Sequence, residues 1–548
     1  MEEHEVEALR KCENLDDINR ILLRFLEEHE KVFNFPYLNV NDKRVLLWSA
    51  LFECLQNDVA TQIHPLCLAA IRILSRDKSH LEKIICEKWI LILAEKADLY
   101  KFGDEYYVIS EGALKKEVIM EALKCLCNLT FNSEVARALC ATTSIAEGLL
   151  ARQRIYKEIS CKDDIMLFDM KLLFILTALR HDIKSKVKGL QGMEYLMNCL
   201  KDLIAESFGC SESASSSNNV GDGVQQCSLA DSQQAVVCEI LKVQFNLILQ
   251  GSDVPADNAE SEMYLKLIAI LRNLLLAQAS SEEKTMELHS NVANLLTSVP
   301  PMCYPYLTPE LDQGDTVQNI YDGKDMNALQ SLVQLLEYRL TLTIGTTNQY
   351  EILSPILTVL NKSSRTCRSQ RKYLRQVVLP PLRDVSLPPE KGSTLRNKLC
   401  KLLTTPVTSV RDLVAEFLFI LCKEKVGRMV KYTGFGNAAG HLAQKGLLGG
   451  GRGADYSSSS DDSDTEEYLE AQPNIDPVVG CTRPPRIDPF EGMTEEQKEY
   501  EAMKLVNLFD KMVSEGVVKP ARIGPDGRPQ AVEHVLELRE NPPNRPQS

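Results

Sequence analysis

The segment LCLAAIRILSRDK, residues 66–78, has the spacing of an amphipathic helix with charge beside its packing side. The apolar positions of this helix fall on one side and are Leu66, Ala70, Ile73 and Leu74. Arg72 and Arg76 are four residues apart, so both guanidinium groups leave the same neighbouring face. The segment therefore predicts a helix with one buried stripe and an adjacent pair of cations.

Two later segments repeat this design with a lysine and an asparagine four residues apart. EALKCLCNLTFNS carries Lys124 and Asn128, and EILKVQFNLIL carries Lys242 and Asn246. The apolar residues beside these pairs are Leu123, Leu126, Cys127 and Thr130 in the first segment and Leu241, Phe245 and Leu249 in the second. We expect one polar ladder along one surface. The alternative is that each pair belongs to the solvated face of an ordinary amphipathic helix.

Leucine stripes with three- and four-residue spacing recur along most of the chain, whereas alternating strand patterns are hard to find. Two to three helices in about 40–47 residues is the signature of armadillo or HEAT-type stacking. The predicted fold class is all-α: an armadillo/HEAT-like α-solenoid superhelix with a disordered acidic linker and a C-terminal helix. Asn128, Asn246, Asn294 and Asn361 recur in similar contexts, at spacings that fit repeats of about 39 residues only in part. Alternatively, these amides are structural and bond to the backbone of a neighbouring repeat.

The composition is that of a folded soluble protein, with 44% hydrophobic and 25% charged residues among 548. The net charge of −14 argues against a general nucleic-acid binder. The 17 cysteines lie mostly in apolar helical runs, and no signal peptide is evident in MEEHEVEALRK, so we expect free thiols in a reducing compartment. Cys125 and Cys127 lack a second ligand pair, which favours core packing over a metal site. No apolar run reaches the roughly 18 residues needed to span a membrane.

Breaks in the helical pattern divide the chain into five parts. Residues 1–425 are expected to form the repeat array, with flexible loops at 206–234 and 301–327. The other parts are a terminal helical segment at 426–448, an acidic phosphorylatable linker at 449–492, a tethered amphipathic helix at 493–515 and a mobile tail at 516–548.

Gly434 and Gly436 form a G-x-G, but no strand precedes it and no Lys-Ser/Thr follows it. A phosphate-binding loop is therefore not expected there.

The linker contains DYSSSSDDSDTEEYLE, a tract with seven carboxylates and no basic residue. Ser458 and Ser463 each have an acidic residue three positions later, which suits an acidophilic protein kinase. A phosphate at either position would deepen a negative patch able to bind Arg or Lys side chains. The alternative for this tract is an unmodified spacer.

The helix predicted at 493–515 has a capping box, with Thr494 as N-cap and Gln497 three residues later. Its apolar stripe consists of Ala502, Val506, Phe509 and Val513. An amphipathic helix on a tether either packs on the array or lays this stripe on a partner.

No residue set indicates covalent chemistry, because the eight histidines are scattered and no H-E-x-x-H or Ser/His/Asp pattern is present. We expect no enzyme activity, cofactor or metal.

Eight segments together resemble the synembryn family (resistance to inhibitors of cholinesterase), which are cytosolic chaperones and guanine nucleotide exchange factors for heterotrimeric G-protein alpha subunits. The segments are IRILSRDK (71–78), LKCLCN (123–128), LFDMKLLFILTALR (167–180), VLPPLRDV (378–385), AEFLFILCKE (415–424), KYTGFGNAAG (431–440), SDTEEY (463–468) and EGMTEEQKEYEAMKLVN (491–507). They span nearly the whole chain in family order. Departures lie in the Ser-rich loop, at 309–327 and in the tail. Three stretches look closer to the synembryn-B form, which serves the stimulatory/olfactory alpha class: SDTEEY, EQKEYEAMKLVN and ELHSNVANLL.

The resemblance implies an armadillo/HEAT-like superhelix whose concave face takes the C-terminal helix of the alpha subunit. By motif, the residues lining that groove are Arg72, Arg76, Asn128, Phe168 and Phe245, beside Lys124, Lys242 and Asn246 of the ladder. The resemblance also implies phosphorylation at Ser458 and Ser463, and it implies that the helix at 494–514, with Val506 and Phe509, holds the Ras-like domain.

The implied partners are alpha subunits that are GDP-bound, nucleotide-free or nascent, and not bound to beta-gamma. The implied location is the cytoplasm, with recruitment to the cell cortex through the alpha subunit. The alternative function is an armadillo-type scaffold that binds acidic peptides without exchange activity.

Overall fold

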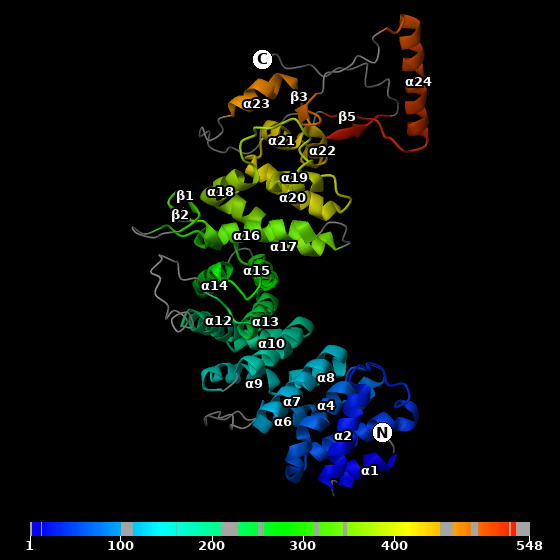
Figure 1. The fold of residues 1–548 in the computed structure, drawn as a ribbon, viewed down its shortest axis with the longest axis vertical. Helices are drawn as coiled ribbons and strands as arrows, with labels where there is room; N and C mark the ends of the chain where they lie inside the picture. The colour runs from blue at the N-terminus through cyan, green and yellow to red at the C-terminus, as the bar shows by residue number, and fades with distance from the viewer. Residues whose placement is uncertain are drawn as a thin grey trace. The chain divides into compact units, whose positions relative to one another are not determined.

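The structure is a computed structural model in which the described residues are 3–11, 14–99, 113–159, 162–209, 228–249, 255, 257–311, 317–342, 348–449, 464–483, 492–524 and 528–532. It is an all-α, armadillo/HEAT-like helical-repeat protein, and the described strands form only short two-stranded hairpins (Figure 1). The chain divides into two compact units, Met1–Tyr306 and Leu307–Ser548. The boundary between the units falls after Tyr306, within the predicted array 1–425.

Unit 1 consists of short helices whose ends are set by local capping. Asn14 precedes α2 (Leu15–His29), and its side chain accepts hydrogen bonds from the N–H groups of Asp16 and Asp17. The other α-helices of the unit are α1 (Glu3–Lys11), α3 (Lys43–Leu55), α4 (His64–Leu74), α5 (Leu81–Ile84), α6 (Glu87–Lys96), α7 (Ala113–Asn132), α8 (Glu134–Thr142), α9 (Ile145–Gln153), α10 (Lys162–Leu179), α11 (His181–Gly189), α12 (Gly192–Gly209), α13 (Asp231–Ile248), α14 (Asn258–Leu276) and α15 (Glu282–Leu296). The 3-10 helices are η1 (Val40–Asp42), η2 (Asp58–Ile63), η3 (Tyr156–Glu158) and η4 (Pro301–Leu307), the last of which spans the boundary between the units.

Four helices carry the predicted ladder, and we call α4, α7, α10 and α13 the ladder helices. They pack in succession, and α13 packs in turn on α15 (Figure 1). The predicted apolar stripes are confirmed only in part. Leu66, Cys127 and Phe245 are half-buried and Leu249 is 41% exposed, whereas the other predicted stripe residues are buried: Ala70, Ile73, Leu74, Leu123, Leu126, Thr130 and Leu241. The stacking of one helix on the next buries a continuous core, and Arg72, Lys124 and Lys242 stay half-buried beside it.

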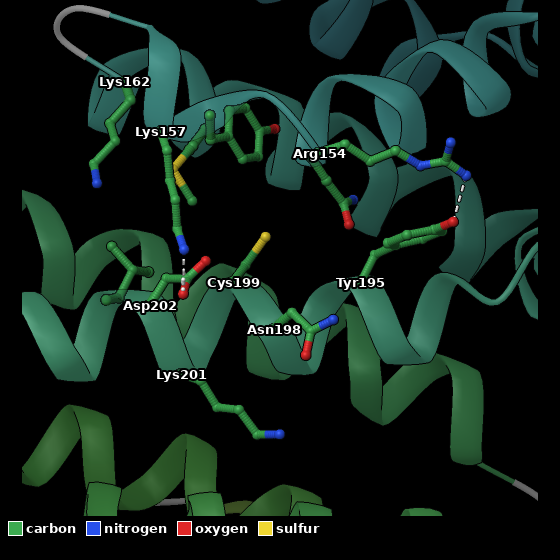
Figure 2. Close-up of a pocket in the computed structure, with 12 residues that line it drawn as sticks. Arg154, Lys157, Lys162, Tyr195, Asn198, Cys199, Lys201 and Asp202 are labelled. Atoms are coloured by element: carbon green, nitrogen blue, oxygen red, sulfur yellow. Dashed lines mark hydrogen bonds and ion pairs between the residues drawn. The ribbon is translucent and has the colours of Figure 1, made fainter.

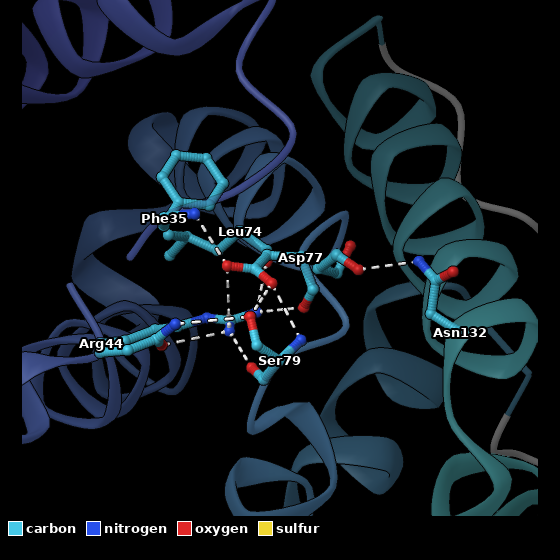
Figure 3. A network of polar contacts seen from close by, with 8 residues as sticks. Phe35, Arg44, Leu74, Asp77, Ser79 and Asn132 are labelled. Carbon is cyan, nitrogen blue, oxygen red and sulfur yellow. Dashed lines mark hydrogen bonds and ion pairs between the residues drawn. The ribbon is translucent and has the colours of Figure 1, made fainter. Parts of the chain in front are cut away.

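The turn that follows α4 is held by a buried ion pair (Figure 3). Arg44 and Asp77 are 1% and 2% exposed. The Arg44 guanidinium donates to the carbonyl oxygens of Leu74 at 2.7 Å and Asp77 at 2.6 Å, and the Asp77 carboxylate accepts the N–H groups of Phe35 at 2.7 Å and Ser79 at 2.8 Å. Burial by itself would raise the pKa of Asp77, but the hydrogen bonds from Ser79 and Phe35 and the charge of Arg44 hold that pKa below its usual value.

Replacing Arg44 by Met is expected to lower the free energy of unfolding of unit 1 by about 3–5 kcal/mol, because Asp77 is left as an unpaired buried charge. The contribution of Asp77 is present at neutral pH and is lost as the pH falls below about 4, because its pKa is lower in the folded than in the unfolded chain. Both tryptophans, Trp48 and Trp89, lie in unit 1, so urea unfolding followed by tryptophan fluorescence reports on this unit.

Arg20→Met is the matched control, because it removes an exposed ion pair with Asp17 and should cost under about 1 kcal/mol. An Arg44→Met variant as stable as the control would show that the buried pair does not hold the turn.

Unit 2 begins with a hairpin and continues as stacked helices. Its elements are β1 (Ile320–Tyr321), β2 (Lys324–Asp325), α16 (Asn327–Leu342), α17 (Gln349–Thr366), α18 (Arg368–Val378), α19 (Leu395–Leu402), α20 (Thr408–Leu421), α21 (Val426–Thr433), α22 (Phe435–Gln444), α23 (Glu466–Ala471), η5 (Gln472–Asn474), β3 (Ile475–Asp476), β4 (Cys481–Thr482), α24 (Glu495–Ser514), β5 (Ala521–Ile523) and β6 (Pro529–Ala531). Residues 410–421 of the segment VRDLVAEFLFILCKE lie in α20, and Phe417 and Leu418 of this helix are fully buried.

Three stretches expected to be loop, linker or tail contain ordered structure. The described part of 301–327 has η4 and the β1–β2 hairpin and buries Cys303 and Tyr304. The described part of the tail carries the β5–β6 hairpin. In the predicted linker, residues 464–483 fold onto unit 2. Of the loop predicted at 206–234, residues 210–227 lie outside the described chain.

Segment 464–483 is fixed to unit 2 by backbone hydrogen bonds. The N–H groups of Phe435 and Gly436, at the start of α22, donate to the carbonyl oxygens of Pro477 at 2.8 Å and Val478 at 2.9 Å. These N–H groups lack partners within their own helix, so the segment caps α22. Gly434 has a φ of +74°, and a Cβ there would lie 2.9 Å from the carbonyl oxygen of Val479. The G-x-G therefore serves close packing of two backbones.

The cysteines that the structure describes are free, and all of them except Cys86 and Cys127 are buried. Burial raises the pKa of the Cys140 thiol to about 12, so it behaves as a small apolar side chain.

Within the described ranges, no helix has the length and apolar character required to cross a bilayer.

Candidate partner-binding surface

The first part of the ladder joins α4 to α7 through one carboxylate and α7 to α10 through a cation–π contact. Glu121 of α7 accepts Arg72 Nε of α4 at 2.7 Å and Lys124 Nζ at 2.7 Å. The ammonium group of Lys124 also lies 5.4 Å from the centre of the Phe168 ring on α10, a cation–π contact. The structure thus brings together Arg72, Lys124 and Phe168, each of which is half-buried.

Arg76 lies outside α4, in the turn two residues after Leu74, because the helix ends before the end of the predicted segment 66–78; it is held from a different direction. Its Nη1 donates to the carbonyl oxygen of Glu30 at 2.6 Å, and its guanidinium lies 5.3 Å from the centre of the Phe33 ring. Burial lowers the pKa of Arg76, and the nearby charge of Arg72 lowers it further. Arg76 is therefore anchored to the segment between α2 and α3, while its neighbour Arg72 faces α7.

The two asparagines of the ladder use their amide groups to join neighbouring helices. Asn128 Nδ2 lies 3.2 Å from the carbonyl oxygen of Arg72 and 3.3 Å from Ser75 Oγ. Asn246 Nδ2 repeats this arrangement, at 3.2 Å from the carbonyl oxygen of Phe174 and 3.1 Å from Thr177 Oγ1. Each amide bonds to a carbonyl and to the hydroxyl three residues later. This is the structural alternative considered for these residues, so they position the ladder helices.

Asn361 of unit 2 also donates to a neighbouring helix, with Nδ2 3.1 Å from the carbonyl oxygen of Leu413. Three of the asparagines that recur in similar sequence contexts therefore donate to a backbone carbonyl of a neighbouring helix, and Asn128 and Asn246 also bond to a hydroxyl.

The last part of the ladder lies on α13. Lys242 Nζ pairs with Glu239 Oε1 of the same helix at 3.0 Å, and Phe245 is half-buried one turn away. Glu239 precedes Lys242 by three residues, as Glu121 precedes Lys124. The repeated spacing E-x-x-K-x-x-x-N was visible in the sequence, and the two glutamates are the surface residues that the sequence reasoning missed. The ladder is therefore mixed in charge, and both of its lysines are paired with glutamates.

The helix predicted at 493–515 is α24, with the expected capping box between Thr494 and Gln497. All of its residues are described and none is buried. Val506 and Phe509 are 49% and 43% exposed. The apolar residues exposed along this helix are Tyr500, Met503, Leu505, Val506, Leu508 and Phe509. An amphipathic helix with such exposure presents apolar area to a partner. The predicted phosphorylation sites, Ser458 and Ser463, lie outside the described residues.

Comparison with known proteins gives a family for this chain. The family described as guanine nucleotide exchange factor synembryn (Ric8) matches residues 67–528. The chain is 40% identical over 534 residues to the chaperone Ric-8A of Xenopus tropicalis, covering 96% of each protein. It is 39% identical over 542 residues to the chaperone Ric-8A of Gallus gallus, with 98% of this chain and 97% of the relative covered. It is 36% identical over 588 residues to the chaperone Ric-8 of Drosophila melanogaster, with 99% and 98% covered.

The match extends from α4 to the hairpin after α24, so it includes the ladder helices and the capped helix together. The closer resemblance to synembryn-B stays a prediction. On this near-complete coverage, the chain belongs to the synembryn (Ric8) family of guanine nucleotide exchange factors and chaperones.

Proposed function

We propose that this chain accelerates nucleotide exchange on heterotrimeric G-protein alpha subunits and acts as a chaperone during their folding. The observation that carries the proposal is the family match over residues 67–528, which includes both the ladder helices and α24. The bound forms are the GDP-bound, nucleotide-free and nascent alpha subunits, and the complex forms without beta-gamma.

The proposed primary contact is between the ladder surface and the C-terminal helix of the alpha subunit. That helix ends in a carboxylate, and the C-terminal end of any helix carries a partial negative charge. Arg72 and Arg76 supply guanidinium groups that suit such a ligand. Arg72 shares Glu121 with Lys124, so two cations stand against one carboxylate and a net positive charge remains for the ligand.

Exchange then follows from differential binding and needs no covalent step. The protein binds the nucleotide-free conformation better than the GDP-bound one and shifts the population toward it. Moving a 1:99 mixture to 99:1 requires about 5.5 kcal/mol of differential affinity. The same preference for an incompletely folded client explains chaperone activity, because a nascent alpha subunit is also without nucleotide. Binding of GTP restores the folded alpha subunit and releases it.

The second proposed contact is between α24 and the Ras-like domain of the alpha subunit. The apolar residues exposed on this helix, with Val506 and Phe509 among them, offer the area that such a contact would bury. A tethered helix allows the two contacts to form on separate parts of one client, which raises the effective concentration of the second contact.

The predicted phosphorylation of Ser458 and Ser463 belongs to the same proposal. Asp464, the residue after Ser463, pairs with Lys431 and lines a cavity of about 270 Å³ together with Arg371, Arg375 and Lys423. A phosphate carries nearly two negative charges and three acceptor oxygens, so phosphorylation next to this basic cavity would strengthen the docking of the acidic segment.

The test is the rate of GDP release from purified alpha subunits of each class, with and without this chain and with and without prior kinase treatment of it. We expect faster release, with the stimulatory/olfactory class responding most, and a further increase after kinase treatment. A scaffold that only binds acidic peptides would leave the release rate of every class unchanged, and that result would overturn the proposal.

A further inference from the structure

A cavity of about 390 Å³ lies in unit 1 between α12 and the segment that joins α9 to α10. Figure 2 shows Arg154, Lys157 and Lys162 on one wall, with Tyr195, Asn198 and Asp202 of α12 on the facing wall. Its volume is in the range of small-molecule sites in proteins, about 300–1,000 Å³. None of the predicted ladder residues is among the described residues that line it, so it is distinct from the partner-binding surface.

The lining of this cavity is strongly cationic. Among the described residues that line it, Arg154, Lys157, Lys162 and Lys201 stand against one carboxylate, that of Asp202. Lys157 Nζ lies 2.9 Å from Asp202 Oδ1, and Lys162 pairs with Glu206, outside the lining. The Arg154 guanidinium donates to the Tyr195 hydroxyl and lies 4.8 Å from the centre of that ring. Both contacts are to the neutral side chain of Tyr195, so neither of them neutralises the charge of Arg154.

A buried amide on the cavity wall provides a second, independent observation. Gln153, the last residue of α9, is 7% exposed and lines the cavity. Neither its Nε2 nor its Oε1 has a hydrogen-bond partner among the described residues. Leaving a buried amide unpaired is costly, so such a group indicates a ligand that offers both a donor and an acceptor. A hydroxyl group on the ligand meets both requirements.

We propose that this cavity binds a polyol carrying two or more phosphate groups, of the inositol polyphosphate type. Arg154 and Lys162 contact the phosphates, since a guanidinium binds phosphate through two parallel hydrogen bonds and an ammonium acts as a point charge. Lys157 exchanges its bond to Asp202 for a bond to phosphate, and the Gln153 amide bonds a ring hydroxyl. The same chemistry occurs in a soluble inositol phosphate and in the headgroup of a phosphoinositide lipid.

The test uses the full chain and two probes that separate these sources. Inositol 1,4,5-trisphosphate is titrated in a calorimeter, and vesicles of phosphatidylcholine with and without phosphatidylinositol 4,5-bisphosphate are used in co-sedimentation. Unphosphorylated inositol is the control ligand. We expect binding of the trisphosphate and none of inositol; co-sedimentation only with the phosphoinositide vesicles would assign the lipid headgroup as the source, and its absence would assign the soluble ligand.

Two variants that act in opposite directions test the site itself. Arg154→Gln with Lys162→Gln should weaken binding at least about tenfold, because two charge-assisted contacts to phosphate are lost. Asp202→Asn should strengthen binding several-fold, because it removes the carboxylate that competes for Lys157. Arg20→Gln with Lys266→Gln removes the same number of charges from exposed positions on α2 and α14 and should leave the affinity unchanged.

Absence of binding of both probes to the unmodified chain would overturn the proposal. The proposal would also be overturned if the affinity fell equally in the cavity double variant, Arg154→Gln with Lys162→Gln, and in its control, Arg20→Gln with Lys266→Gln. Binding would then reflect net charge alone. The Asp202→Asn measurement keeps the test decisive if the double variant fails to fold. The result is independent of the proposed exchange activity, since neither probe involves an alpha subunit.

Discussion

A chain carrying Arg72→Glu together with Arg76→Glu is expected to lose at least about 100-fold in affinity for alpha subunits and to leave GDP release at its unassisted rate. Breaking one hydrogen-bonded charge pair at an interface costs about 2–5 kcal/mol, and each factor of ten in affinity corresponds to about 1.4 kcal/mol. The substitutions also place a new carboxylate beside Glu121, which now holds Arg72 and Lys124. Affinity is measured by titration against GDP-bound and nucleotide-free alpha subunits, and exchange by release of labelled GDP.

Two controls separate loss of the surface from loss of the fold. Arg20→Glu with Lys266→Glu makes the same change in net charge at exposed positions outside the ladder helices, and should leave affinity and exchange unchanged. The neutral variant, Arg72→Gln with Arg76→Gln, should give an intermediate loss, and the fluorescence of Trp48 and Trp89 reports whether unit 1 remains folded. If the chain with Arg72→Glu and Arg76→Glu stays folded and binds alpha subunits with unchanged affinity, these arginines are not part of the interface.

The second large effect is expected on α24. Val506→Asp with Phe509→Asp should reduce the rate of assisted GDP release at least about tenfold, while binding of the isolated C-terminal peptide of the alpha subunit stays unchanged. Full burial of a Val or Phe side chain stabilises a complex by about 1.5–3 kcal/mol, and both groups are exposed in the free protein. Because no residue of α24 is buried, the substitutions should not disturb the stability of the free chain.

A matched change on the same helix is Glu496→Ala with Glu499→Ala, which alters exposed polar residues and leaves the apolar positions intact. Removal of residues 490–548 should reproduce the loss of exchange seen with the aspartate variant. Normal exchange by the truncated chain would favour the peptide-binding scaffold, because a peptide receptor has no use for a tethered helix.

Local sequence signals predicted the helices and their caps well. The Thr494–Gln497 box acts within a few residues, so the pattern alone contains the interaction. The fold class followed from the leucine spacing, because stacked helices need little beyond a stripe to bury. The helix predicted over 66–78 ends at Leu74, and element boundaries of this kind depend on packing as well as on periodicity.

Local sequence patterns did not predict the interactions between residues that are distant in the chain. The bond between Arg72 and Glu121 joins residues on different helices, and only the coordinates show that two cations share this carboxylate. The docking of residues 464–483 on α22 depends on two glycines, Gly434 and Gly480, that let two backbones approach closely. Composition predicted a disordered linker there, because acidic and Ser-rich sequence precedes a short segment that is held by backbone hydrogen bonds and by side chains such as Asp464 and Thr465, which contact distant residues. Arg76 shared a helical face with Arg72 in the sequence, yet the carbonyl oxygen of Glu30 fixes its direction.

The most direct test of the central claim is amide hydrogen exchange of this chain, free and in complex with a nucleotide-free alpha subunit. If the ladder helices receive the C-terminal helix of the client, peptides from α4, α7, α10 and α13 should become protected, and a synthetic peptide of that C-terminal helix should protect the same four helices by itself. Protection confined to other helices of unit 1 or to unit 2, with the ladder helices unchanged, would contradict the account.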